Sequence, residues 1–470
     1  MKEIPNDGII RYLGIFNQER LLLTNSDGVR DVLVTNPYHF HKQRAQKIHL
    51  EPVLGKGLVF VEGDTHKFHR KQMSPAFSAK CIRDCQPIFW KKTMEIVDIF
   101  GRQINHQSCQ PQSKDGHPRQ DLEKASIRDK DRLGVVEVHD PVSRAALDII
   151  GLAGCSFDFD SVKKDENQNK TVREYRKAFG VSRSNRIRCL LAHVLPAWFV
   201  NRAPIQRNKD IAVVTRLVRS IAQNIIYTKR GNSTQKSQNP DFLDKAMQSG
   251  GFGDAVLVEQ VKTLLAAGHD TTSSTLASAV AMLSQPKYHH VQERMRAEIR
   301  EKLPSPLTST TLAPSADIEN MTYVNAVRNE ILRLFAPFSW YFRRSVVDTT
   351  VCGIPVPAGT DVILCPWGMH RSKKLWGADA EDFNPDRWLE DPTGRGGAKD
   401  AYCFSTFGAG PRVCIAERFA RNEITTLMAG IFGRYRVECA DGVPESPLSH
   451  QLTLTRMGGV SVHMTTLEGW

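Results

Sequence analysis

Short apolar and polar runs alternate along the first sixty residues, a pattern that predicts β-strands joined by turns. The runs are Gly8–Phe16, Leu21–Thr24 and Val32–Thr35. From about Thr65 to Arg300 the apolar residues recur instead with helical spacing. The chain therefore opens with a small β region and continues as a large helical one.

Strand and helix patterns both return later in the chain. Val351–Leu364 places two glycines and two prolines between β-branched residues, which indicates strands joined by tight turns, and Arg434–Thr466 again predicts short strands. Helices are predicted at Asp254–Gln285, Tyr323–Phe335 and Glu417–Gly430. We therefore predict an α+β fold that is mainly α, a helix-rich body with small β-sheets at its edges.

Two polar segments interrupt the helical region without dividing it. Gln103–Asp131 is rich in Gln, Ser, Lys, Asp and Pro and is typical of a solvated insert, and Arg230–Pro240 is a shorter loop of the same kind. Helical patterns of the same character resume after each, and we find no internal repeat. We therefore expect residues 1–470 to form a single domain.

Composition and charge narrow the class of protein. Hydrophobic residues make up 41% and charged residues 24% of the 470 residues, as in a folded globular protein. The 63 Lys and Arg against 51 Asp and Glu give a net charge of +12, which is dilute over this length. The sequence contains no basic run interleaved with aromatics of the kind that predicts nucleic-acid binding. The charge therefore favours contact with an acidic protein partner or an anionic membrane surface.

The ten cysteines contain no Cys-x-x-Cys pair and do not cluster as in a disulfide-rich secreted domain. A reducing compartment is therefore expected. No signal peptide or membrane span opens the chain, and the apolar stretch Leu190–Val200 is too short to span and contains Pro196. Its Trp198 and Phe199 predict either contact with a bilayer surface or a buried helix end.

The loop around Cys414 is the most informative segment. Two glycines in Phe407–Ala416 let backbone approach a flat or bulky group, and Pro411 stiffens the loop. The N-terminus of the following helix and Arg412 are both expected to favour a thiolate. A soft axial iron ligand requires such a thiolate, although a buried structural cysteine, or a nucleophile with a nearby histidine, has to be weighed against it.

A second candidate segment interrupts the long predicted helix at Ala267–Thr272. Glycine followed by two threonines is poor helix material, and a threonine hydroxyl can take a carbonyl of the preceding turn and open a groove. A kinked helix with a small residue, a hydroxyl and a carboxylate can seat a diatomic ligand and deliver protons to it. The alternative is an ordinary helix with a polar stripe and a glycine packing contact.

Both segments resemble motifs of the cytochrome P450 family. The loop matches the haem-binding signature Phe-x-x-Gly-x-Arg-x-Cys-x-Gly at Phe407, Gly410, Arg412 and Cys414, and departs from it at Ala416, where glycine is usual. Ala267–Thr272 is similar to the oxygen-activation motif at every fixed position. The resemblance implies haem b (iron protoporphyrin IX), with Cys414 as axial thiolate and metal ligand, held between the long central helix and the cysteine loop.

The resemblance also implies roles for the other motif residues. Asp270 and Thr271 would form the acid–alcohol pair that passes protons to dioxygen, and His269, at the variable position, is not expected to be a second iron ligand. Glu330 and Arg333, three apart on a largely apolar helix, and the later Arg387 match the family's structural triad. That triad supports the haem site and takes no part in catalysis.

Haem carries two propionates, and a buried dianion requires fixed cations. His66 and Arg70 are four residues apart where the family often has tryptophan or histidine followed by arginine. Arg343, with Arg344 as the neighbouring alternative, precedes the family's Gly-x-x-x-Pro-x-Gly-Thr strand pair, and Arg412 completes the set.

The resemblance covers nearly the whole chain and is strongest to eukaryotic microsomal members from filamentous fungi. It implies a haem-thiolate monooxygenase that hydroxylates or otherwise oxidises a lipophilic small molecule with dioxygen, as in fungal secondary metabolism. Since the chain has no dinucleotide or flavin segment, electrons would come from NADPH through a separate NADPH–cytochrome P450 reductase, with cytochrome b5 as a further donor. The substrate pocket would include residues before His66, Leu190–Val200, the long helix and Phe338–Tyr341.

Relatives of this kind lie on the cytosolic face of the endoplasmic reticulum. This chain begins where their catalytic domain begins and lacks their amino-terminal anchor, so a soluble cytoplasmic form is the other expectation. Three other functions have to be weighed against the monooxygenase. They are a haem-thiolate isomerase or dehydratase acting on hydroperoxides, a non-catalytic haem-binding protein, and an ordinary thiol enzyme.

Overall fold

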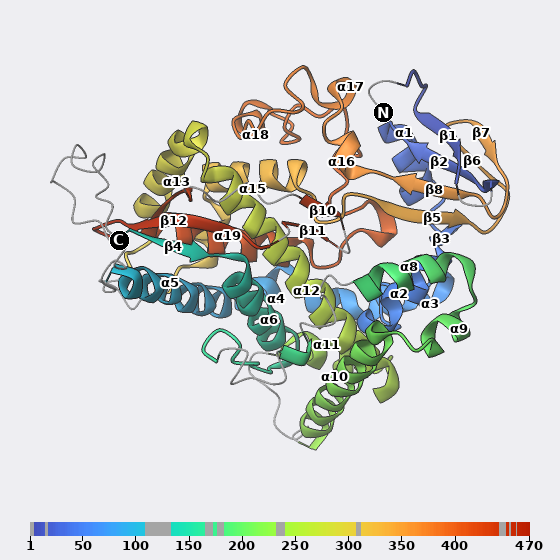
Figure 1. The fold of residues 1–470 in the computed structure, drawn as a ribbon, viewed down its shortest axis with the longest axis horizontal. Helices are drawn as coiled ribbons and strands as arrows, with labels where there is room; N and C mark the ends of the chain where they lie inside the picture. The colour runs from blue at the N-terminus through green and yellow to red at the C-terminus, as the bar shows by residue number, and fades with distance from the viewer. Residues whose placement is uncertain are drawn as a thin grey trace, which may run out of the picture.

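A mainly helical body carries one β-sheet beside the N-terminal segment and a second near the C-terminus (Figure 1). The structure is a computed structural model, and it describes residues 4–14, 17–108, 133–164, 173–175, 183–231, 240–306, 312–440, 448–450, 453–456 and 458–470. The predicted fold class, mainly α with small sheets, is confirmed.

The larger sheet joins segments far apart in the sequence. Its strand order is β1 (Ile9–Leu13), β2 (Glu19–Leu23), β8 (Asp361–Leu364), β5 (Tyr341–Ser345) and β3 (Phe40–Lys42). The β2–β8 pair is parallel, and the other pairs are antiparallel. In the β3–β5 register, Lys42 lies opposite Arg343. The sheet therefore brings two cations from distant segments to one place.

The remaining strands lie in smaller units. A three-stranded antiparallel sheet has β12 (Ser461–Thr466) between β4 (Leu133–Glu137) and β9 (Tyr435–Cys439). Two hairpins pair β6 (Thr349–Val351) with β7 (Ile354–Val356), and β10 (Leu448–His450) with β11 (Leu454–Arg456).

The helices make up most of the described chain. They are α1 (Ser26–Arg30), α2 (Arg44–Leu54), α3 (Gly63–Met73), α4 (Ala79–Asp84), α5 (Gln86–Ser108), α6 (His139–Cys155), α8 (Arg183–Val194), α9 (Ala197–Arg202), α10 (Gln206–Gly231), α11 (Phe242–Gln248), α12 (Asp254–Leu283), α13 (His289–Lys302), α14 (Ser315–Glu319), α15 (Thr322–Leu334), α16 (Pro366–Met369), α17 (Lys373–Trp376), α18 (Arg387–Glu390) and α19 (Glu417–Arg434). None of the helices within the described ranges is both long and apolar enough to cross a bilayer.

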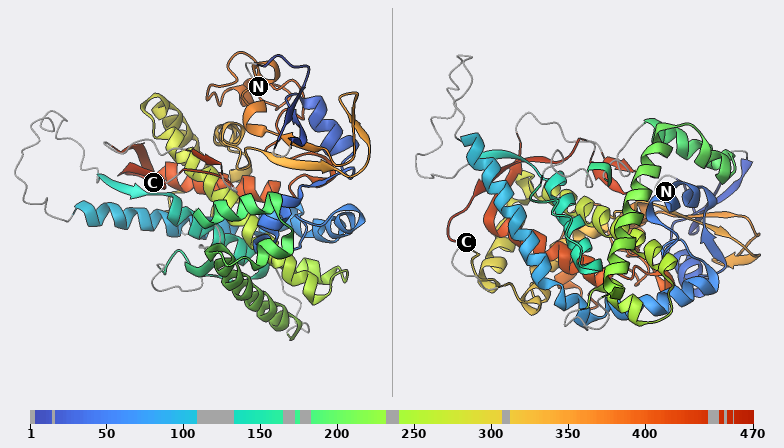
Figure 2. Two further views of the ribbon diagram at one scale, coloured as in Figure 1. Left: turned by 45° about the vertical axis from the view of Figure 1, so that its right-hand side comes forward. Right: turned by 90° about the horizontal axis from the view of Figure 1, so that it is seen from below.

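The long helix α12 is the centre of the packing. It contacts α6, α10, α2 and α19, so helices from both halves of the chain are built around it (Figures 1 and 2). The largest apolar cluster joins the C-terminal part of α12 to α5, α13, α15 and α19, and a second cluster joins its N-terminal part to α6, α10 and α11. Burial on nearly every side explains why this helix is apolar around its whole circumference.

Two local predictions are wrong. Val32–Thr35 is not a strand: Asp31–Thr35 forms a turn of π-helix that continues α1. The Asn25 side chain accepts a hydrogen bond from the Gly28 N–H and starts α1, and the buried Val32 and Leu33 then pack with the helix rather than in the sheet. The predicted break at Ala267–Thr272 is also wrong, because α12 continues through it.

The other expected elements are present with shifted ends. The predicted strands near Val351–Leu364 and Arg434–Thr466 correspond to β6–β8 and β9–β12. The first six residues of the predicted polar insert, 103–108, belong to α5, and the segment 109–132 lies outside the described residues. Strand β4, just after the insert, was not predicted.

Candidate haem and oxygen site

The cysteine loop is a tightly hydrogen-bonded turn before α19. Gly410–Arg412 forms a 3-10 turn, and the Cys414 N–H donates to the Phe407 carbonyl at 2.8 Å. Gly410 has φ +66°, and a Cβ there would lie 2.1 Å from the Leu33 carbonyl oxygen. Only glycine fits at this position, so the π-helical turn Asp31–Thr35 fixes the loop from behind.

Alanine fits at the position where the family pattern departs. Ala416 is the residue before α19 and has φ −97°, ψ 18°, which an L-residue adopts without strain. Its carbonyl accepts from the Ala420 N–H at 2.9 Å and starts the helix. The alanine therefore leaves the loop geometry intact.

The side chain of Cys414 is exposed, although it lies far inside the protein. Desolvation by burial raises the pKa of its thiol to about 11, and it outweighs the Ala416 N–H, Arg70 and Arg421, which lower that pKa. Cys414 thus combines accessible surface with a desolvated thiol. The backbone N–H before α19 lowers this pKa, as expected for a helix N-terminus, and desolvation outweighs it.

The Arg412 side chain lies beside Glu62 and Tyr38. Its buried guanidinium pairs with Glu62 and lies over the Tyr38 ring, 5.1 Å from the ring centre. None of its nitrogens makes a hydrogen bond with the described residues. The guanidinium therefore still has donors for another acceptor.

Glu62 is the centre of a strongly cationic cluster. It accepts the Lys42 backbone N–H at 2.8 Å and pairs with Lys47 at 3.3 Å and with Arg412. These contacts lower its pKa to about 2 despite burial. Burial, followed by the charge of Arg343, lowers the pKa of the Lys42 ammonium well below its usual value. Lys42, Arg343 and Arg412 together have a single carboxylate partner here, so the cluster lacks negative charge.

The structure distinguishes between the two neighbouring arginines. Arg344 pairs with Asp361 at 3.3 Å and its side chain is partly exposed. Arg343 is buried, and its Nε has no hydrogen-bond partner in the described chain. Arg343 is therefore the candidate for an anion, as predicted.

Helix α3 brings His66 and Arg70 to the same region. Arg70 Nη1 donates to the Val413 carbonyl, directly before Cys414. His66 Nδ1 and the Tyr38 hydroxyl lie 3.2 Å apart, and burial, followed by the charge of Arg412, lowers the pKa of His66 to about 4. Burial and the surrounding cations favour the neutral ring, and the predicted role of His66 beside a propionate stays a prediction.

The motif on α12 faces three different neighbours. The Thr271 hydroxyl donates to the Ala267 carbonyl at 2.9 Å, as predicted for a threonine in this segment. The next residue, Thr272, donates to Glu423 of α19 at 3.1 Å. Asp270 accepts at 2.7 Å from Thr453, which precedes β11. His269 is buried with its ring 5.4 Å from Tyr175, on the side of the helix that packs against other protein.

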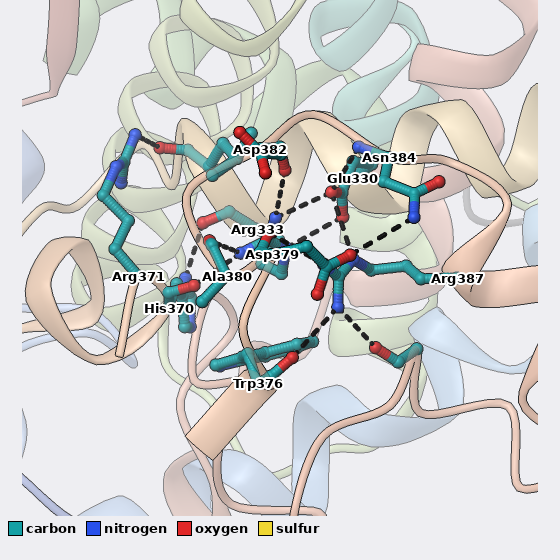
Figure 3. Close-up of polar contacts among 12 residues, drawn as sticks. Glu330, Arg333, His370, Arg371, Trp376, Asp379, Ala380, Asp382, Asn384 and Arg387 are labelled. Atoms are coloured by element: carbon teal, nitrogen blue, oxygen red, sulfur yellow. Dashed lines mark hydrogen bonds and ion pairs between the residues drawn. The ribbon is translucent and has the colours of Figure 1, made fainter. Parts of the chain in front are cut away.

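The predicted structural triad is present in full (Figure 3). Arg333 makes two hydrogen bonds with the Glu330 carboxylate, at 2.8 and 2.7 Å, and Arg387 Nε lies 3.3 Å from the same carboxylate. Arg333 also donates to the carbonyls of His370, Ala380 and Asp382. Both members of the Glu330–Arg333 pair are fully buried, and these extra partners satisfy the pair's remaining donors.

Four residues of this site escaped sequence reasoning: Tyr38, Lys42, Glu62 and His370. Lys42 ends a strand and Glu62 precedes a helix, so each is an ordinary charged residue until the sheet brings it beside Arg343 and Arg412. A lone carboxylate between basic segments is a weak signal. For His370, the only signal in the sequence was its position beside Arg371 in a turn.

The described residues fit haem. Cys414, a free cysteine with accessible surface, would provide the thiolate ligand, and the described residues leave buried nitrogens of Arg412 and Arg343 without a hydrogen-bond partner. The cationic cluster that contains them has too few carboxylates, which suits a group with two carboxylates. The cysteine loop, α3 and the Glu62 cluster therefore lie together, and Thr272 and Glu423 join α12 to α19, the helix that follows the loop.

Comparison with known proteins agrees with this geometry. The family model described as "Cytochrome P450" matches residues 8–462. The chain is 34% identical to cytochrome P450 monooxygenase sphH of Aspergillus fumigatus, with 100% of this chain and 83% of that protein aligned. It is 32% identical to cytochrome P450 monooxygenase FSL4 of Gibberella zeae (99% and 83%) and 31% identical to ALT8 of Alternaria alternata (98% and 84%).

Proposed function

Because this chain belongs to the cytochrome P450 family, we propose that it is a haem-thiolate monooxygenase whose cofactor is held by Cys414. The observation that carries the assignment of the ligand is Cys414, a free cysteine with accessible surface, on a loop in which only glycine fits at position 410. Haem bound there supplies the activation of dioxygen, with the thiolate favouring cleavage of the oxygen–oxygen bond.

The cations near Glu62 would hold the two propionates. Arg343 and Arg412 have unused buried donors, and an anion beside Lys42 would raise the lowered pKa of its ammonium. The neutral His66 contributes a hydrogen bond, and Arg70 holds the Val413 carbonyl and thereby orients the ligand loop. Phe407, under the Arg421 guanidinium at 4.9 Å, packs the loop against α19.

Asp270 and Thr271 would manage protons at the dioxygen site. The Thr271 hydroxyl is already bonded to its own helix, so it can accept a hydrogen bond from another donor at the same oxygen. Asp270 is half-buried and supplies the carboxylate that exchanges protons. The roles of both residues come from the family motif that they match.

The substrate would be a lipophilic small molecule. Phe338 and Trp340 follow α15, and both keep exposed ring surface; they would form an apolar wall of the pocket. Three relatives are fungal cytochrome P450 monooxygenases aligned over nearly the whole chain, which supports a role in fungal secondary metabolism. NADPH–cytochrome P450 reductase would supply electrons, with cytochrome b5 as a further donor, at the cytosolic face of the endoplasmic reticulum.

The carbon monoxide spectrum of the reduced protein tests the ligand. The wild type is expected to show the strongly red-shifted band that thiolate ligation gives, and Cys414→Ser is expected to lose it. Cys439→Ser is the matched control, because Cys439 is also free and exposed. A band that survives in Cys414→Ser, or is lost in Cys439→Ser, would refute the assignment.

A further inference from the structure

The carboxylate of Asp270 is held from outside its own helix. Thr453 Oγ1 donates to Asp270 Oδ2 at 2.7 Å, and Thr453 is almost completely buried, with 4% of its surface exposed. Within the described residues, the hydroxyl of the neighbouring motif residue Thr271 donates back to α12. The orientation of the carboxylate therefore depends on a segment about 180 residues later in the sequence.

That segment is also joined to the expected wall of the substrate pocket. Leu454, next to Thr453, donates its backbone N–H to the Pro337 carbonyl at 2.7 Å. Pro337 directly precedes Phe338, whose ring is partly exposed. Thus Thr453, just before β11, bonds to α12, and Leu454, the first residue of β11, bonds to the Pro337 segment.

We propose that Thr453 is a positioning residue for Asp270, and that it links proton handling on α12 to the pocket wall at Pro337–Phe338. This inference rests on the proposed proton role of Asp270. A hydroxyl that donates to a carboxylate makes a charge-assisted bond, and it restricts the rotation of the carboxylate about its side-chain torsions. Without the bond, the carboxylate adopts orientations that do not serve proton transfer.

The consequence is measurable as the fate of dioxygen. When protons arrive too slowly, one NADPH reduces one dioxygen to hydrogen peroxide, which is released: O₂ + NADPH + H⁺ → H₂O₂ + NADP⁺. When they arrive in time and no substrate is present, two NADPH reduce one dioxygen to two waters. The ratio of peroxide released to NADPH oxidised therefore reports proton delivery, independently of the unidentified substrate.

The first experiment measures the bond itself without turnover. Urea unfolding of the holoenzyme is followed for Thr453→Val, Asp270→Ala and the double variant. Because the two groups are bonded, the double variant is expected to be more stable than additivity predicts, by about tenfold in the unfolding equilibrium constant. Thr263→Val is the matched control: Thr263 lies on the same helix, is similarly buried, and donates to the Leu54 carbonyl at 2.7 Å. The effects of Thr263→Val and Asp270→Ala on stability should be additive. If the effects of Thr453→Val and Asp270→Ala were also additive, the inference would be overturned.

The second experiment measures peroxide per NADPH in the reductase-reconstituted holoenzyme with no added substrate. Thr453→Val, and Thr453→Ala as a second variant without the hydroxyl, are expected to raise the ratio at least twofold, whereas Thr453→Ser and Thr263→Val keep the wild-type value. If Asp270→Ala raises the ratio but neither Thr453→Val nor Thr453→Ala does, the inference about Thr453 is overturned and the proton role of Asp270 stands. A ratio unchanged by Asp270→Ala would remove the proposed proton role, and the inference with it.

Discussion

His370 accepts a hydrogen bond from the backbone N–H of Ser405, with 3.0 Å between the two nitrogens. Its other ring nitrogen, Nδ1, lies 2.7 Å from the Arg333 carbonyl. A carbonyl can only accept and an N–H can only donate, so the ring is the neutral Nδ1–H tautomer. The fully buried histidine thus joins the helix of the structural triad to the loop that leads to Cys414.

We expect this histidine to make the protein less stable in acid. Burial is the main cause that lowers its pKa from 6.5 to about 3. Between these values the unfolded chain binds a proton that the folded protein does not. The free energy of unfolding should therefore fall with pH from about 6.5 towards 3, by up to about 1.4 kcal/mol per pH unit.

The measurement compares wild type with His370→Gln, which can still donate and accept but does not titrate. Urea unfolding at several pH values should show a steeper acid decline for the wild type. At neutral pH the variant should be less stable by about 1–3 kcal/mol, because the glutamine cannot match both hydrogen bonds. Parallel pH profiles for the two proteins would contradict the prediction.

The buried pair Glu330–Arg333 predicts a large loss of stability when one partner is removed. Glu330→Gln leaves the buried Arg333 guanidinium without its carboxylate and leaves Arg387 with Asp379 as its carboxylate partner. We expect the free energy of unfolding to drop by about 3–5 kcal/mol, together with loss of haem during purification. Denaturant unfolding and haem content per chain measure the two effects.

An exposed pair with the same spacing is the control for this prediction. Asp64 and Lys67 are also three apart on a helix, and their oxygen and nitrogen lie 2.8 Å apart. Both side chains are exposed, so water replaces the lost interaction and Asp64→Asn should change stability too little to measure. Similar effects of Asp64→Asn and Glu330→Gln would show that burial does not set the cost.

These contacts show why some of the site could be predicted and some could not. Glu330 and Arg333 are three residues apart on one helix, and the Cys414 signature is a single loop, so local spacing was enough. The bond between His370 and Ser405, or between Glu62 and Arg412, depends on long-range packing that no local pattern contains. The same limit explains Val32–Thr35, where β-branched residues continue a helix because of their neighbours.

Lys42 should stabilise haem and destabilise the protein without it. Its ammonium is close to Arg343 and Arg412 and far from bulk water, which explains its strongly lowered pKa. Lys42→Met removes this repulsion, so the haem-free protein should become more stable. The same variant loses a partner for a propionate, so haem should be lost about tenfold faster.

Haem transfer to excess apomyoglobin measures the rate of loss, and urea unfolding of the haem-free protein measures its stability. Lys56→Met is the control, because the Lys56 side chain is mostly exposed and pairs with the Glu51 carboxylate at 3.6 Å. Greater stability of the haem-free protein together with faster loss of haem in Lys42→Met would distinguish a propionate site from a general packing defect. If both effects were losses, the lysine would be structural.

Finally, the segment α8–α9 predicts binding to a membrane surface. Leu190, Val194, Trp198 and Phe199 all expose their side chains, with Trp198 at 63%. Their neighbours Ala192 and Val200 are buried in an apolar cluster. The exposed side chains therefore lie on a packed pair of helices, and only part of the stretch is a buried helix end. Arg188 is buried and donates to the Ile48 carbonyl, so its charge is not available to lipid headgroups.

Burying one aromatic side chain in an apolar phase contributes about 1.5–3 kcal/mol. The double variant Trp198→Ala, Phe199→Ala should therefore bind vesicles of phosphatidylcholine and phosphatidylserine at least tenfold more weakly in a sedimentation assay, without a change in thermal stability. Tyr227→Ala is the matched control, because Tyr227 on α10 is 82% exposed yet is separate from the α8–α9 surface. An equal loss in Tyr227→Ala, or none in the double variant, would show that the protein does not meet the bilayer through α8–α9.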